Sequence, residues 1–157
     1  MEIKRILFPT DFSEGSAHAV PYVVDLTKHY QARLYVVHVL YDIAKGTGFY
    51  VPHVNIEELY SDMERNALKE CEKWCCEELR GYKEIEYRIL KGIPHEEILK
   101  FADENTIDIL ITGTHSRKGL DRVFFGSTAE RVVRNAKCPV LTVGPPVQRK
   151  TVEAERK

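Results

Sequence analysis

Short apolar runs alternate along the chain with longer segments in which apolar residues recur at helical spacing. Five runs have the length and composition of strands: Ile3–Phe8, Arg33–Leu40, Lys83–Leu90, Asp108–Thr112 and Pro139–Val143. Four helices are expected between them: Glu14–Tyr30, Asn55 to about Arg80, Pro94 to about Asn105, and Ser127–Asn135. This alternation predicts an α/β fold, in which one parallel sheet carries helices on both faces.

The start of the first helix can be read in two ways. Ser13 alone, or Asp11 together with Glu14, has the chemistry of an N-terminal cap. Pro21 lies well inside the same helical pattern. An interior proline removes a backbone hydrogen bond, so we expect one helix with a bend near Ala17–Pro21.

Two segments fall outside the alternation. Residues 41–54 contain Gly46, Gly48 and Pro52 and show no periodicity. Long loops of this kind often contact partners, so this segment is a candidate surface for a protein partner.

From Pro145 to Lys157 the chain is polar and led by proline, which is typical of a frayed tail. We therefore expect one domain over residues 1–144 and a tail over 145–157.

Length and charge exclude several classes of protein. The 157 residues correspond to one domain, and 23 basic against 24 acidic residues leave a net charge of −1. That balance disfavours electrostatic binding of nucleic acid. No apolar run approaches the roughly 18 residues of a membrane span. The amino-terminal segment does not resemble a secretory signal, so we expect a cytoplasmic protein.

Four cysteines are present: Cys71, Cys75, Cys76 and Cys138. The first three fall in the second helix, but no nearby histidine completes a set of metal ligands. Reduced, partly buried thiols are the expected state, and the cluster receives no assigned role.

The parallel sheet predicts where a ligand binds, because such sheets bind ligands beyond the carboxyl ends of their strands. The segments expected there are Pro9-Thr10-Asp11, the turn after Val39, Gly92, and the loop 113–127. The chain has neither a G-x-G-x-x-G dinucleotide motif nor a P-loop. The third strand ends in lysine and glycine, where a phosphorelay receiver would need an aspartate.

Phosphate chemistry is suggested by Gly126-Ser127-Thr128, which lies at the predicted start of the last helix. Free amides and the helix dipole favour an anion there, and Arg117 with Lys118 adds positive charge. A purely structural interpretation is also available. Ser127 and Glu130 form an S-x-x-E capping pattern, and Gly113 could simply form a turn.

Several segments together resemble the universal stress protein family. They are 9–13 (PTDFS), 92–98 (GIPHEEI), 113–116 (GTHS), 126–130 (GSTAE) and 138–143 (CPVLTV), and the resemblance covers about residues 2–144. It implies a flavodoxin-like, five-stranded sheet of order 3-2-1-4-5 and a homodimer. It also implies, for one branch of the family, ATP binding through Gly-x2-Gly-x9-Gly-Ser/Thr.

Mapped onto that pattern, Gly113 and Gly126-Ser127 fit, but Ser116 replaces the middle glycine. This serine either crowds the phosphates or donates its hydroxyl to them. The resemblance places Asp11 at the adenine end and the backbone of Val39 against adenine. The implied nucleotide site comprises Pro9, Thr10, Asp11, Val39, Gly113, His115, Ser116, Arg117, Gly126, Ser127 and Thr128. Mg²⁺ is expected with the ATP, and no protein ligand for it is predicted.

Three function classes follow. The first is a regulatory, ATP-binding stress-response protein, and the second is a nucleotide-independent dimer that acts through protein contacts. The third is a weak ATPase or phosphotransferase, since His95 or His115 could act on a phosphoryl group. No set of nucleophile, base and orienting group is evident, so we expect slow ATP hydrolysis at most.

The two expected sheet edges differ in charge. Lys83–Leu90 alternates apolar with charged residues, which is typical of a defended edge strand, whereas Val140, Leu141, Thr142 and Val143 carry no charge. An undefended edge favours pairing with a second copy of the chain, so we predict a homodimer through the last strand. The alternative is that the tail folds back over this edge.

Overall fold

The computed structural model describes residues 2–42, 56–75, 79, 81–114 and 126–145. Its five strands form one sheet in which every neighbouring pair is parallel. They are β1 (Arg5–Pro9), β2 (Arg33–Tyr41), β3 (Ile85–Gly92), β4 (Ile109–Gly113) and β5 (Val140–Val143). Their order is β3-β2-β1-β4-β5, which confirms the expected 3-2-1-4-5 arrangement.

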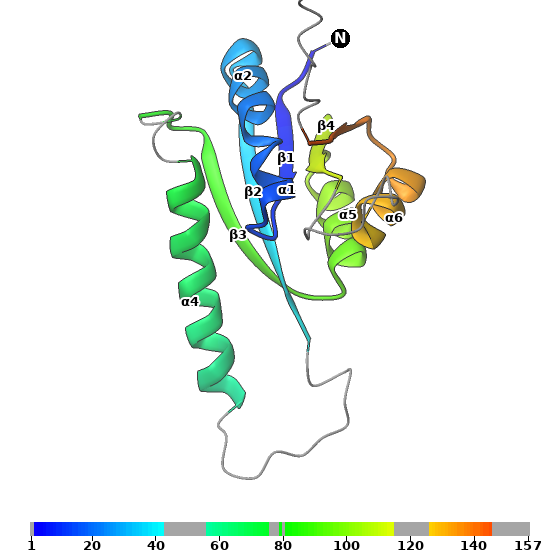
Figure 1. Ribbon diagram of the computed structural model, residues 1–157. Coiled ribbons are helices and arrows are strands. Elements are labelled where there is room, and N and C mark those ends of the chain that lie inside the picture. The colour runs from blue at the N-terminus through cyan, green and yellow to red at the C-terminus, as the bar shows by residue number, and fades with distance from the viewer. Residues whose placement is uncertain (1, 43–55, 76–78, 80, 115–125, 146–157) are drawn as a thin grey trace, which may run out of the picture.

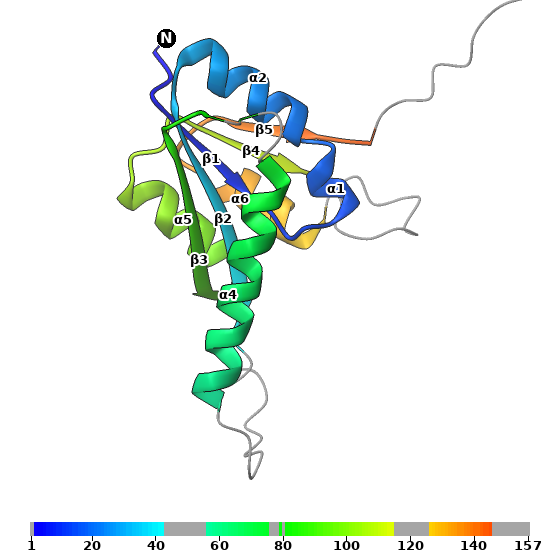
Figure 2. The ribbon, with the colours of Figure 1, turned by 90° about the vertical axis from the view of Figure 1, so that its left-hand side faces the viewer.

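Helices cover both faces of the sheet (Figures 1 and 2). They are α1 (Glu14–Ala17), α2 (Val20–Tyr30), α4 (Ile56–Cys75), α5 (Pro94–Glu104) and α6 (Ser127–Asn135). In Figure 1 the first three lie on one side of the strands, and α5 and α6 lie on the other. None of the helices in the described ranges is long and apolar enough to cross a membrane.

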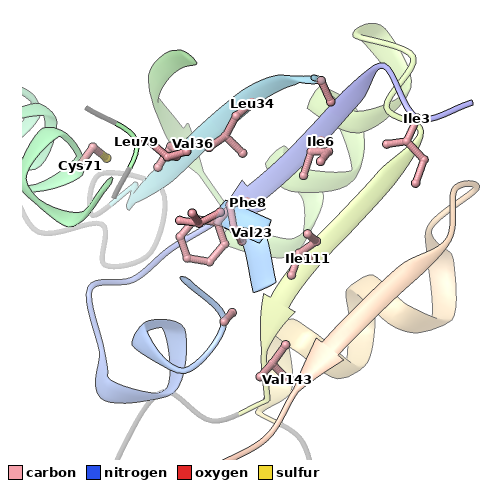
Figure 3. Packing of buried hydrophobic residues seen from close by; sticks show 13 residues of the cluster. Ile3, Ile6, Phe8, Val23, Leu34, Val36, Cys71, Leu79, Ile111 and Val143 are labelled. Carbon is pink, nitrogen blue, oxygen red and sulfur yellow. The ribbon is translucent and has the colours of Figure 1, made fainter. Parts of the chain in front are cut away.

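Each face of the sheet has its own apolar core. On the α2 and α4 face, Ile6, Phe8 and Leu34 are fully buried and pack with Val23 of α2 (Figure 3). On the opposite face, a second cluster gathers around Leu7 and the buried side of α5. Central strands that are apolar on both sides place the sheet in the middle of three layers.

The edge position of β3 is confirmed. Ile85, Tyr87 and Ile89 pack against the first core, while Glu86 and Arg88 form an ion pair. Alternate side chains of a strand point to opposite faces, so this strand packs its half-buried apolar set against the core and directs Glu86 and Arg88 to the other face.

The first helix differs from the prediction: two helices, α1 and α2, replace one bent helix. Ser13 caps α1, because its side chain accepts a hydrogen bond from the backbone of Ser16 at 3.3 Å. Pro21 lies in the first turn of α2. A proline has no N–H to donate but fits the first turn of a helix, so the chain starts a new helix there.

The predicted cap of the last helix is wrong by one residue. Ser127 is the first helical residue, and Gly126 is the N-cap, without a side-chain hydrogen bond. The S-x-x-E pattern is therefore not used as a capping box. The other strand and helix boundaries shift by one or two residues, except that α4 ends at Cys75 and not at about Arg80. Residues 76–78, 80, 43–55, 115–125 and 146–157 lie outside the described ranges.

Candidate functional site

A pocket of about 230 Å³ opens at the carboxyl ends of β1, β2 and β4. β1 pairs with β2 on one side and with β4 on the other, so the strand order reverses at this point. Ligands of doubly wound sheets bind at such a reversal. Eight predicted site residues line the pocket: Pro9, Thr10, Asp11, Val39, Gly113, Gly126, Ser127 and Thr128. His115, Ser116 and Arg117 lie outside the described residues.

The turn after β1 is held in a special conformation. Phe12 has a positive φ of 60°, which non-glycine residues seldom adopt. The hydroxyl of Thr10 accepts a hydrogen bond from Phe12 N at 3.1 Å, and His38 Nδ1 donates to the Thr10 carbonyl at 2.8 Å. The rings of Phe12 and His38 stack, with centroids 4.5 Å apart. His38 thus fixes the turn from the neighbouring strand.

Asp11 lies in this turn and lines the pocket. Its Oδ1 accepts hydrogen bonds from Ser16 Oγ at 2.7 Å and from Ser13 N at 3.1 Å. No described residue donates a hydrogen bond to the other oxygen, Oδ2. One oxygen therefore sets the orientation of the group, and the other remains able to accept from a ligand. Ser16 was missed by sequence reasoning because its partner is defined only by the turn.

The start of α6 forms the opposite end of the pocket. Gly126 is extended there (φ −70°, ψ 153°), and its N–H donates to Thr114 O at 2.6 Å. The first N–H groups of a helix have no partner inside the helix, and no side chain caps this one. Ser127 and Thr128 add hydroxyls to the pocket lining. The arrangement is suited to an anion.

Between these two ends the wall of the pocket is apolar. Val37 and Val39 contribute from β2, Pro94 and Ile98 from α5, and Val132 from α6. A mostly apolar pocket with a few polar groups at its ends is the usual form of a small-molecule site. Gly92 does not line it, although the sequence places Gly92 at the same edge of the sheet.

Gly113 has a steric role at the end of β4. A Cβ atom built on it would lie 2.6 Å from the carbonyl carbon of Gly15 and 3.0 Å from the nitrogen of Ser16. Real Cβ atoms do not approach backbone this closely, so only glycine fits against α1. Gly113 is therefore required for close packing against α1, whereas the sequence also allowed that it simply forms a turn.

The described residues offer no protein site for a metal, because they contain no group of three or more histidine, cysteine, aspartate or glutamate residues that could hold one. Cys71 is fully buried in the α4 core, and burial raises the pKa of the Cys138 thiol. A raised pKa keeps that thiol protonated and unreactive. Cys76 and the side chain of Cys75 lie outside the described part of the chain.

Fold and pocket together define a doubly wound α/β protein with an apolar cleft between a carboxylate and a helix N-terminus. The model of the universal stress protein family matches residues 2–144, so the chain belongs to that family.

Relatives and solved structures agree with this assignment. The chain is 36% identical over 147 residues to universal stress protein MJ0531 of Methanocaldococcus jannaschii, covering 91% of this chain and 83% of the relative. It is 32% identical over 154 residues to universal stress protein MJ0577 of the same organism, covering 89% and 94%. The structure of MJ0577 superposes with a TM-score of 0.78 at 30% identity, covering 93% of this chain and 99% of that one.

A universal stress protein from Archaeoglobus fulgidus has been solved in complex with dAMP. It shares the fold at a TM-score of 0.57 and 23% identity, and covers 91% of this chain and 99% of that chain.

Proposed function

We propose that this universal stress protein binds ATP, together with Mg²⁺, in the pocket at the carboxyl edge of its sheet. It would act in the stress response as a regulatory protein and as a homodimer. The observation that carries the proposal is the pocket itself, which joins a hydrogen-bond-accepting carboxylate to an uncapped helix N-terminus across an apolar wall.

In this proposal the base binds at the Asp11 end. Adenine carries an amino group that donates hydrogen bonds, and Asp11 Oδ2 is an acceptor without a donor among the described residues. The neighbouring Val37 and Val39 supply the apolar surface on which a planar base can lie. The dAMP-bound relative supports an adenine ligand for a member of this family.

The phosphates are placed at the α6 end. The amides of the first turn and the hydroxyls of Ser127 and Thr128 can donate to phosphate oxygens, and the helix dipole favours their charge. The predicted loop residues Ser116 and Arg117 would complete this end. Mg²⁺ typically binds through phosphate oxygens and water, which suits a pocket without a carboxylate cluster in its described part.

Binding rather than turnover is the proposed activity. His38 is the histidine of the described pocket lining, and its Nδ1 is committed to the Thr10 carbonyl. His95 lies at the start of α5, where its Nε2 is 3.4 Å from Arg131 Nη1. Among the described residues neither histidine forms a triad-like set with a nucleophile, and His115 lies outside them. The proposal is therefore slow hydrolysis at most.

Gly126→Val tests the proposal. A Cβ atom at Gly126 would meet Thr114 O at 3.4 Å and otherwise open space, so the fold should tolerate the change. The added side chain would stand in the phosphate end of the pocket. Calorimetric titration with MgATP should show binding to the parent and none to the variant. Val133→Ala, on an exposed position of α6, is the control that should bind as the parent does.

The proposed dimer uses the edge of β5 with which no strand of the described residues pairs. Leu110 N donates to Pro139 O, and Thr114 N donates to Val143 O, each at 3.0 Å. Alternate residues of a strand direct their polar groups the same way, so the N–H of Thr142 points away from β4. Val140, Leu141 and Thr142 are uncharged and half-buried. A second copy could pair there around a two-fold axis.

A further inference from the structure

We infer that α1 is a brace between the Asp11 end of the pocket and the end of β4, and that Gly113 serves base selectivity rather than phosphate binding. Ser16 is the positioning residue in this brace. The inference rests on the proposed adenine nucleotide site and deepens it. It concerns how the chain discriminates between bases, through residues that position the Asp11 carboxylate.

The first half of the brace joins Asp11 to α1. Ser16 is a buried residue whose hydroxyl donates to Asp11 Oδ1 at 2.7 Å. Its backbone N–H donates to Ser13 Oγ at 3.3 Å, which holds the same serine in the first turn of α1. The position of the Asp11 carboxylate is therefore set by the position of α1.

The second half joins α1 to β4. The backbone of Gly15 and Ser16 lies directly against Gly113, with no room for even a methyl group between them. Gly113 has no positive φ, so the glycine is required here by space and not by backbone conformation. A larger residue at 113 would push α1 away from the sheet, and Ser16 with it.

A displaced Ser16 would leave Asp11 Oδ1 with the Ser13 N–H as its remaining donor among the described residues. The carboxylate could then turn, and its Oδ2 would no longer be fixed toward the base. Such a variant should lose discrimination between bases and keep its phosphate binding, because the phosphate end of the pocket is built from a different element, α6. Gly113 and Gly126, two glycines of the same motif, thus have separable effects.

The test compares ATP with ITP, whose base has a carbonyl where adenine has its amino group. The two ligands carry identical phosphates, so the ratio of their affinities reports the base end alone. Calorimetry measures both affinities for the parent, Ser16→Ala, Gly113→Ala and Gly126→Ala. Thermal unfolding is followed for each variant to check that it folds.

The parent should prefer ATP. Ser16→Ala and Gly113→Ala should reduce that preference about tenfold, the usual effect of losing a hydrogen bond to a charged group. Gly126→Ala should weaken ATP and ITP by the same factor and keep the preference. If Gly113→Ala does not fold, Ser16→Ala, which adds no bulk, decides the question.

Three results would overturn the inference while the proposed function stands. The first is a parent that binds both nucleotides equally, and the second is a Ser16→Ala variant that keeps the parent's preference. The third is a Gly113→Ala variant that folds and loses ATP and ITP equally, which would assign Gly113 to the phosphates. A parent that binds neither nucleotide would overturn the proposed function, and this inference with it.

Discussion

At the scale of single residues, one buried polar side chain bears directly on the free energy of unfolding. Thr27 of α2 is fully buried, and its hydroxyl has no hydrogen-bond partner among the described residues. Tyr82 donates to the Thr27 carbonyl at 3.3 Å and not to its hydroxyl. A buried polar group without a partner lowers the free energy of unfolding.

Thr27→Val should therefore stabilise the fold. Valine keeps the shape of threonine and removes the unpaired hydroxyl, so the free energy of unfolding should rise by about 1 kcal/mol. Urea denaturation monitored by circular dichroism measures the change. Thr27→Ser is the matched control: it keeps the hydroxyl and loses a buried methyl, so it should destabilise by about 1 kcal/mol. A valine variant less stable than the parent would contradict this account.

A second residue-scale prediction concerns Ser116, which replaces the middle glycine of the family pattern. If it simply fills a glycine position, Ser116→Gly should bind MgATP as tightly as the parent or more tightly, since the Cβ no longer crowds the phosphates. Calorimetry compares the two. A large loss of affinity would instead assign the serine hydroxyl as a phosphate donor.

The sequence predicts only some of the site residues and their roles. Asp11, Gly126, Ser127 and Thr128 follow from the family pattern, and the structure brings them into one pocket. The role of Gly113 against Gly15 was not predictable, because the two are distant in sequence and their contact depends on how α1 sits on the sheet. The stacking of Phe12 on His38 depends likewise on strand pairing.

At the scale of elements, the end of α2 carries local backbone strain. Gln31 ends α2 in the left-handed conformation (φ 52°, ψ 38°), which usually requires glycine. Sequence patterns locate such ends but do not say which residue takes the unusual dihedrals. For the same reason the S-x-x-E pattern at Ser127 predicts the cap one residue late, and the helical pattern around Pro21 predicts a bend where a new helix starts.

Gln31→Gly should raise the free energy of unfolding by about 0.5 kcal/mol. Relief of the left-handed strain outweighs the extra freedom that glycine gives the unfolded chain. Lys28→Gly, in the last turn of the same helix, should lower it by about 1 kcal/mol, because glycine is a poor helix former. Thermal and urea unfolding of both variants provide the comparison, and a glycine at 31 that destabilises as much as one at 28 would refute the assignment.

For the whole molecule, the order and direction of the strands were predictable to a large extent. Alternating strand and helix patterns require a parallel sheet, and the charges on β3 marked it as an edge. The family resemblance supplied the order. The homodimer does not follow from strand patterns in the same way, because an edge strand pairs with a second copy only where no other part of the chain covers that edge.

The dimer prediction is tested by Thr142→Pro. Proline removes the N–H that points away from β4, so the internal ladder stays intact while pairing with a second copy is blocked. Sedimentation should show a dimer for the parent and a shift toward monomer for the variant. Thr142→Val, which keeps the N–H, should remain dimeric. A parent that is monomeric at tens of micromolar would refute the β5 interface.

Native mass spectrometry of the purified chain, before and after addition of MgATP, tests the central claim most directly. If the parent binds nucleotide, its mass should increase by one adenine nucleotide per chain. That nucleotide is either carried through purification or taken up on titration. The Gly126→Val variant should show no such increase. A chain that shows no such mass at millimolar MgATP, in the parent as in the variant, would contradict the claim and favour a protein that acts through protein contacts alone.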